Sequence, residues 1–137
     1  VRPAALRATE IGGALIPRLI DELPALAVAA TQAEGVTVIC DAAELRVKET
    51  DRVEATVAQL RRLGARVEAR PDGMVIEGPT RLAGAPATGG QDHRIAMSLV
   101  VAGLVAAGET TVQDVDFISD SYPGFLETLA ELGAELR

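Results

Sequence analysis

Cysteine, histidine, lysine and aromatic residues are all scarce in this chain of 137 residues. The single cysteine, Cys40, excludes an internal disulfide and a cysteine-based zinc site. Its place in the run VTVIC predicts a buried strand position. A chain without disulfides fits a reducing cytoplasm, which is the location we expect. His93 is the only histidine, so no metal site is expected.

Aromatic residues make up 2% of the chain, too few for the stacking platforms that single-stranded nucleic acids need. The formal net charge of −7 also argues against binding to a phosphate backbone, so no nucleic-acid partner is expected. A membrane partner is not expected either, because the longest apolar run, IAMSLVVAGLVAAG, is shorter than the ~18 residues of a membrane span. A small anionic ligand stays possible, since a few local cations can hold one.

Apolar residues make up 48% of the chain, which predicts a folded protein with a core of alanine, valine, leucine and isoleucine. We expect residues 1–137 to form one domain or most of one. The chain begins with valine rather than methionine, which suggests a fragment or a processed chain.

An internal repeat is the strongest pattern along the chain. In each copy an aspartate precedes an apolar helix, a glycine precedes a strand rich in β-branched residues, and an amphipathic helix ends in Leu-Gly-Ala. The copies are predicted at about 15–78 and 79–137. Each is interpreted as helix, strand, helix and hairpin, which predicts an α/β fold of about two repeated units, with buried helices packed against mixed sheets.

Local patterns place the elements of these units. Residues 23–33 and 95–107 are apolar nearly all round, so both are predicted to be buried helices. Apolar residues at helical spacing predict an amphipathic helix over 53–63, and the Pro-Asp-Gly triplet at 71–73 predicts the turn of a hairpin. The stretch 78–90, rich in glycine and proline, is interpreted as a connector between the copies.

Charged residues gather where two of the predicted helices begin. The stretch LRVKETDR (45–52) contains five charged residues, among them Lys48, the only lysine, and DHR (92–94) precedes the second apolar helix. Helix N-termini carry free N–H groups and a partial positive charge, so they are suited to bind anions. Lys48, Arg52 and Arg94 would add full positive charges at such a site.

A purely structural interpretation of the same residues is also open, and the pattern alone favours it. Asp21 and Asp92 suit the N-caps of the two apolar helices, and Asp51 or Thr50 suits the N-cap of the amphipathic helix. The LRVKETDR stretch would then be a solvated, salt-bridged helix start.

Three sequence motifs, taken together in their order along the chain, favour a functional interpretation of these charged residues over the structural one. The runs IPRLIDELPALAVAA (16–30), LRVKETDR and DHRIAM (92–97) together resemble the 5-enolpyruvylshikimate-3-phosphate synthase family, and the similarity extends from about residue 16 to the end. The resemblance implies the enolpyruvyl transferase fold, with two domains that each contain three βαβαββ units. This chain would be the C-terminal part, and a missing N-terminal part would complete the enzyme.

The resemblance also implies an activity. Members of the family are transferases that move the carboxyvinyl group of phosphoenolpyruvate to the 5-hydroxyl of shikimate 3-phosphate, in the shikimate pathway to aromatic amino acids, without a metal or organic cofactor. Its partners would be these two substrates and the N-terminal part, and the isolated chain would be inactive. Two alternatives stay open: a fragment of UDP-N-acetylglucosamine enolpyruvyl transferase, and a non-catalytic binding or assembly module.

Three residues receive catalytic roles from the resemblance. Asp21 matches the carboxylate that takes the proton of the 5-hydroxyl group, and Glu49 matches the acid that protonates the methylene carbon of phosphoenolpyruvate. As an acid, Glu49 must be protonated when it acts, which burial would favour. Lys48 matches a lysine that binds at the junction of the two substrates.

The remaining implied site residues bind substrate. Arg52 and Arg94 match arginines that hold the phosphoenolpyruvate carboxylate, because a guanidinium group recognises a carboxylate with two parallel hydrogen bonds. His93 matches a histidine beside them. Asp120 departs from the pattern, because many members of the family have a lysine at that position.

Overall fold

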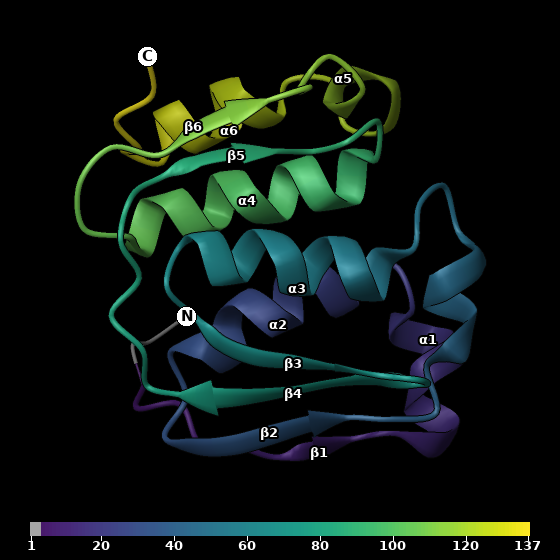
Figure 1. Cartoon of the computed structure of the whole chain (residues 1–137). Helices are drawn as coiled ribbons and strands as arrows, with labels where there is room; N and C mark the ends of the chain where they lie inside the picture. Colours follow the sequence, from purple (N-terminus) through teal and green to yellow (C-terminus); the bar gives the residue numbers. More distant parts are fainter. Residues whose placement is uncertain (1–3) are drawn as a thin grey trace.

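Two sheets form opposite sides of the protein, with helices α2, α3 and α4 between them (Figure 1). The structure is a computed structural model that describes residues 4–137. The larger sheet has the strand order β1-β2-β4-β3, and the smaller one pairs β5 with β6. In the larger sheet β1 and β2 are parallel, whereas β4 is antiparallel to both β2 and β3. The predicted α/β class with mixed sheets and buried helices is therefore confirmed.

The first half of the chain runs strand, helix, strand, helix, strand, strand. Its elements are β1 (Glu10–Ile11), a 3-10 turn η1 (Gly13–Leu15), α1 (Ile16–Leu19), α2 (Leu23–Thr31), β2 (Gly35–Ile39), a 3-10 turn η2 (Ala43–Val47), α3 (Arg52–Arg62), β3 (Arg66–Arg70) and β4 (Gly73–Gly78). The predicted amphipathic helix and hairpin are both present. Strand β1 lies before the predicted start of the first copy at about residue 15.

The second half runs strand, helix, strand, helix. Its elements are β5 (Pro86–Thr88), α4 (His93–Val105), β6 (Thr111–Gln113), α5 (Ile118–Ser121) and α6 (Phe125–Glu131). Strands β5 and β6 are parallel, like β1 and β2. The stretch 78–90 is thus more than a connector, because it contains β5. Within residues 4–137 no strand follows α6, so the hairpin expected in each copy is found only in the first half.

Left-handed backbone positions recur at matching places in the two halves. Gly13 and Gly90, which follow β1 and β5, both have φ of 57°. Asp41 and Asp114, which follow β2 and β6, have φ of 58° and 56°. Few residues other than glycine adopt this conformation, so its recurrence supports two copies of one unit. The boundaries of those copies stay a prediction.

The main core lies between the four-stranded sheet and the helices α2, α3 and α4. Its largest fully buried apolar side chains are Leu23, Ile39, Leu45, Leu60, Leu63, Met74, Ile76, Leu82 and Ile95. Cys40, predicted at a buried strand position, is instead half-buried just beyond β2, because the strand ends where the chain turns at Asp41. Every helix within residues 4–137 is too short or too polar to span a membrane.

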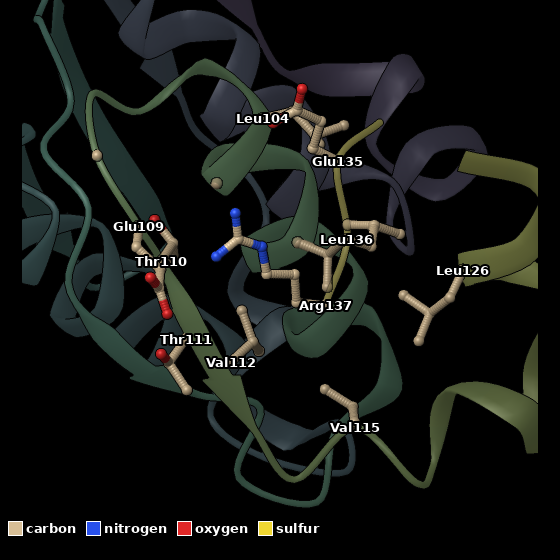
Figure 2. Close-up of a pocket in the computed structure, with 13 residues that line it drawn as sticks. Leu104, Glu109, Thr110, Thr111, Val112, Val115, Leu126, Glu135, Leu136 and Arg137 are labelled. Atoms are coloured by element: carbon tan, nitrogen blue, oxygen red, sulfur yellow. The ribbon is translucent and has the colours of Figure 1, made fainter. Parts of the chain in front are cut away.

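A surface hollow of about 570 Å³ lies beside β6, between α4 and the C-terminal residues (Figure 2). Its walls include Leu104, Val112, Leu126 and Leu136. The hollow contains none of the site residues predicted from the sequence, so the predicted site and this surface are separate features.

Candidate active site

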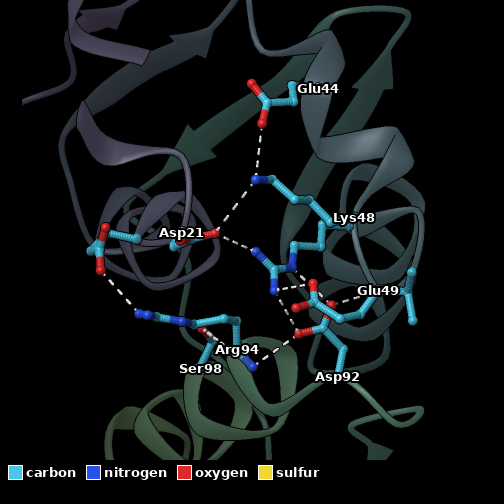
Figure 3. A network of polar contacts seen from close by, with 10 residues as sticks. Asp21, Glu44, Lys48, Glu49, Asp92, Arg94 and Ser98 are labelled. Carbon is cyan, nitrogen blue, oxygen red and sulfur yellow. Dashed lines mark hydrogen bonds and ion pairs between the residues drawn. The ribbon is translucent and has the colours of Figure 1, made fainter. Parts of the chain in front are cut away.

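The starts of three helices converge on one buried arginine. Arg52 is the first residue of α3, and its side chain is 1% exposed. It lies between Asp21, just before α2, and Asp92, the N-cap of α4. Residues from three distant parts of the sequence therefore form one polar network (Figure 3).

Four hydrogen bonds hold the guanidinium group of Arg52. Nε and Nη2 donate to the two carboxylate oxygens of Asp92 at 2.8 and 3.3 Å. Nη1 donates to Oδ1 of Asp21 at 2.8 Å, and Nη2 donates to Oε2 of Glu49 at 2.6 Å. The fork to Asp92 fixes the plane of the guanidinium group. Because arginine has five N–H donors, one Nη1–H is left for a further acceptor.

Asp92 is completely buried, and its hydrogen bonds explain how a buried carboxylate is tolerated. Besides Arg52, it accepts hydrogen bonds from Oγ1 of Thr50 at 3.0 Å and from the backbone N–H of Arg94 at 2.9 Å. Burial acts to raise the pKa of Asp92, but these hydrogen bonds and the charge of Arg52 outweigh it and lower that pKa.

Asp92 has a second role that the sequence pattern did not reveal. Its predicted capping of α4 is confirmed, since it accepts from a backbone N–H of the first turn. It also orients Arg52, which is 40 residues away in the sequence. The only local signal was its place in the DHR triplet, because the pairing itself depends on how α3 packs beside α4.

Asp21 was predicted to cap α2, and that prediction is wrong. The N-cap of α2 is Glu22, and no side chain accepts a hydrogen bond there. The carboxylate of Asp21 instead accepts from Arg52 and lies 4.0 Å from Nζ of Lys48. A long-range ion pair thus replaces a local cap, and Asp21 faces two cations.

Lys48 lies at the rim of the same network. Its Nζ is 2.9 Å from Oε1 of Glu44, one helical turn earlier in the sequence. The hydrogen bond to Glu44 outweighs partial desolvation and raises the pKa of Lys48, so the side chain is a cation at neutral pH.

The side chain of Glu49 is 50% exposed in this chain. It belongs to the segment between η2 and α3, where no element covers it. Its contact with Arg52 nevertheless joins it to Asp21 and Asp92 in one network.

Arg94 and His93 lie in the first turn of α4 and are more accessible than Arg52. Nη1 of Arg94 is 2.9 Å from Oε1 of Glu22, and the Arg94 side chain is 29% exposed. His93 is half-buried and makes no side-chain hydrogen bond among the residues that the structure describes. The structure therefore brings Arg94 to the start of α2, while no hydrogen bond connects His93 to the network.

A second arginine anchors the segment that carries Lys48 and Glu49. Asp51 accepts hydrogen bonds from two backbone N–H groups of α3, which confirms its predicted capping role. Arg46 donates to the Asp51 carboxylate at 2.8 Å and to backbone carbonyls of residues 70 and 71, next to the hairpin turn. The segment is thus tied at once to α3 and to the β3–β4 hairpin.

A family model described as EPSP synthase (3-phosphoshikimate 1-carboxyvinyltransferase) matches residues 2–129. The chain belongs to the EPSP synthase family. Two curated relatives named 3-phosphoshikimate 1-carboxyvinyltransferase, from Bacillus cereus and Gloeobacter violaceus, are 52% and 59% identical to it over 132 residues. The matches cover 96% of this chain but 31% of each relative, so the chain spans less than a third of their length.

Solved structures agree with this family assignment. An EPSP synthase from Acinetobacter baumannii superimposes with a TM-score of 0.89 at 37% identity, over 93% of this chain and 30% of that one. The enolpyruvyl transferase NikO from Streptomyces tendae gives a TM-score of 0.74 at 25% identity, over 99% and 30%. The predicted enolpyruvyl transferase fold is confirmed, and the alternative of a UDP-N-acetylglucosamine enolpyruvyl transferase fragment is not favoured.

Asp120, where many members of the EPSP synthase family were expected to have lysine, is exposed on α5. Within residues 4–137 it takes part in no ion pair of the network around Arg52. No group of three or more potential metal ligands occurs within the same residues. Lys48, Arg52 and Arg94 are the predicted site cations that the structure brings to the starts of α2, α3 and α4.

Proposed function

We propose that the complete protein is a 3-phosphoshikimate 1-carboxyvinyltransferase and that this chain forms one wall of its active site. The reaction transfers the carboxyvinyl group of phosphoenolpyruvate to the 5-hydroxyl of shikimate 3-phosphate and releases phosphate. The observation that carries the proposal is the network around Arg52, where Asp21 and Glu49 bind different nitrogens of one guanidinium group. Family membership supports the same reaction.

The two carboxyl groups are proposed to move protons in opposite directions. Asp21 accepts the proton of the 5-hydroxyl as that oxygen bonds to C2 of phosphoenolpyruvate, and Glu49 donates a proton to the C3 methylene. The tetrahedral adduct then loses a proton from C3 while the C2–O bond to phosphate breaks, which restores the double bond. These steps involve no net oxidation or reduction, so no redox cofactor is proposed.

Three cations are proposed to hold the substrates. Lys48 lies 4.0 Å from Asp21, which suits a position between the two substrates. Arg94 suits the phosphoenolpyruvate carboxylate, because its side chain is partly exposed and its present partner, Glu22, is a carboxylate that a ligand can replace. Arg52 contributes its remaining Nη1–H to the same group.

His93 is proposed as a further substrate contact, since it adjoins Arg94 at the start of α4. The remaining N-terminal part of the protein is proposed to complete the site, because this chain spans less than a third of its curated relatives. A cytoplasmic location is proposed as well, on the ground that a single cysteine offers no internal disulfide.

Steady-state kinetics of the complete protein test these roles. Glu49→Gln and Asp21→Asn should each lower kcat by ~10²–10⁴-fold, with a smaller change in KM, because each removes a proton-transfer group. Glu54→Gln is the matched control, since Glu54 lies in the first turn of α3 but outside the network, with a 60% exposed side chain. A near-normal kcat for either site variant would remove the role proposed for that residue.

The isolated chain provides a second test. The 137-residue chain without the rest of the protein should release no phosphate from the two substrates, because half of the proposed cleft is absent. Adding the remaining part should restore release. Turnover by the isolated chain at the rate of the complete protein would contradict the proposed division of the site.

A further inference from the structure

Glu49 lies in a segment without regular secondary structure, between η2 and α3. In the described part of the chain, its backbone groups make no hydrogen bond to another backbone group. Side-chain contacts therefore fix its place. On the α3 side these contacts are made by Glu49 itself, which accepts from Arg52, and by Thr50, which donates to Asp92. The contacts on the η2 side come from Arg46.

The guanidinium group of Arg46 joins the turn of the β3–β4 hairpin to the start of α3. Its Nε donates to the carbonyl of Pro71 at 2.8 Å, and Nη2 donates to the carbonyl of Arg70 at 2.6 Å. Its Nη1 donates to Oδ2 of Asp51, the N-cap of α3, at 2.8 Å. Glu54 adds a contact at 3.2 Å, but its side chain is 60% exposed, so this pair contributes little.

The turn of the hairpin is a firm support for this contact. Strand β4 pairs with both β2 and β3, so the sheet holds the turn from two sides. Figure 1 shows the turn at the same end of the molecule as the segment that joins β2 to α3. Asp72 also holds the beginning of that segment, because its carbonyl accepts from the N–H of Ala42 at 2.7 Å and its carboxylate accepts from the N–H of Asp41 at 2.9 Å.

Arg61 offers a matched comparison, because it ties the other end of α3 to the same hairpin. Its Nε donates to the carbonyl of Val67 in β3 at 2.8 Å. Among residues 4–137 it makes no side-chain hydrogen bond to the segment between β2 and α3. Both arginines therefore connect α3 with the hairpin, but only Arg46 also holds the segment that contains Glu49.

We propose that Arg46 is a positioning residue for the reaction and that it acts through Glu49. Four of its five N–H donors bind protein atoms, which is the pattern of an anchor rather than of a substrate-binding group. By holding Asp51 against the hairpin, it fixes the backbone two residues after Glu49 and so the direction of the Glu49 carboxyl group. Proton transfer needs that alignment, and a displacement of about 1 Å can cost ~10²-fold in rate. The inference rests on the role proposed for Glu49.

Steady-state kinetics of the complete protein test this role. Arg46→Met should lower kcat ~10- to 10²-fold with a smaller change in KM, whereas Arg61→Met should keep kcat within about twofold of the parent. Arg46→Lys keeps a donor for Asp51 and the two carbonyls, so it should recover part of the lost kcat. Arg46→Gln replaces Arg46→Met if that variant fails to fold, with the same expected pattern. Equal kcat values for the Arg46 and Arg61 variants, or no recovery by Arg46→Lys, would overturn the proposal.

Two double variants test whether Arg46 acts through Glu49. With Glu49→Gln already present, adding Arg46→Met should change kcat by less than about twofold, because the group that Arg46 positions is gone. With Arg94→Met present, the same addition should cost as large a factor as in the parent, since Arg94 lies on another helix. An equal loss in both backgrounds would overturn the positioning role and leave the proposed function intact. A near-normal kcat for Glu49→Gln alone would contradict the proposed function and remove the positioning role with it.

Discussion

Arg52 and Arg94 stand in the first turns of two helices, each behind a capping aspartate, yet their surroundings differ. The side chain of Arg52 is 1% exposed and pairs with three carboxylates. The side chain of Arg94 is 29% exposed, and among residues 4–137 its one ion pair is with Glu22. The difference arises from packing, because Arg52 lies between Asp21 and the buried Asp92, whereas Arg94 reaches the exposed Glu22.

Arg52 is held in place by its partners, whereas the partner of Arg94 can be exchanged for another. Burial makes each hydrogen bond of Arg52 costly to lose, since its partner Asp92 has no access to water. Exposure makes the pair of Arg94 with Glu22 weak and replaceable. The same residue type is thus held by buried partners in one place and by an exposed partner in the other.

The largest expected effect comes from removing the two arginines in turn. Arg52→Met in the complete protein should cost ~3–5 kcal/mol of unfolding free energy, because it leaves the buried carboxylate of Asp92 without its cation. The matched variant Arg94→Met should cost ~0–1 kcal/mol, since its ion pair is exposed. Urea unfolding measures both, and equal losses would contradict the contrast between the two residues.

A smaller effect is expected when the carboxylate of that buried pair is neutralised. Asp92→Asn should cost ~1.5–3 kcal/mol at neutral pH, the usual value of hydrogen bonds to charged groups. The pKa of Asp92 is lowered in the folded protein from an ordinary value of 3.8, so its stabilising effect is complete above that pH and is lost on acidification. The difference between variant and parent should therefore shrink below pH 3.8.

Urea unfolding of the parent protein and of Asp92→Asn at several pH values tests whether their difference in stability shrinks on acidification. A difference that grew as the pH fell would mean that Asp92 is held protonated in the folded protein. Glu34→Gln is a suitable control, since Glu34 is exposed and lies outside the network.

The smallest effect is expected at Thr50, whose hydroxyl donates to Asp92 at 3.0 Å. Thr50→Val should cost ~0.5–1.5 kcal/mol, the net value of one hydrogen bond, while Thr50→Ser keeps the donor and should cost less. Thermal unfolding of both variants distinguishes them. A loss from Thr50→Ser as large as that from Thr50→Val would show that the methyl group, rather than the hydroxyl, matters at this position.

Local features of the fold could be predicted from the sequence because they depend on neighbouring residues. The helix over 53–63 follows from apolar spacing, and the hairpin follows from the Pro-Asp-Gly triplet at 71–73. The caps Asp51 and Asp92 need only the backbone of the next turn. Strand β5 could not be predicted, because its three residues lie in a glycine- and proline-rich stretch and form a strand only beside β6.

Long-range contacts explain the features of the site residues that could not be predicted from the sequence. Asp21 pairs with Arg52, 31 residues away in the sequence, and does not cap α2. The 50% exposure of the Glu49 side chain could not be predicted, since it depends on which elements pack over the segment between η2 and α3. The DHR motif indicated that Arg94 is a candidate anion-binding residue. Only the packing of the helices shows that Asp92 holds Arg52.

The acceptor specificity of the complete protein tests the central claim most directly. Phosphate release from phosphoenolpyruvate should occur with shikimate 3-phosphate as acceptor and should be absent with UDP-N-acetylglucosamine. Release with the sugar nucleotide alone, or with neither acceptor, would contradict the assignment of Asp21, Glu49 and the cations around them to a 3-phosphoshikimate 1-carboxyvinyltransferase.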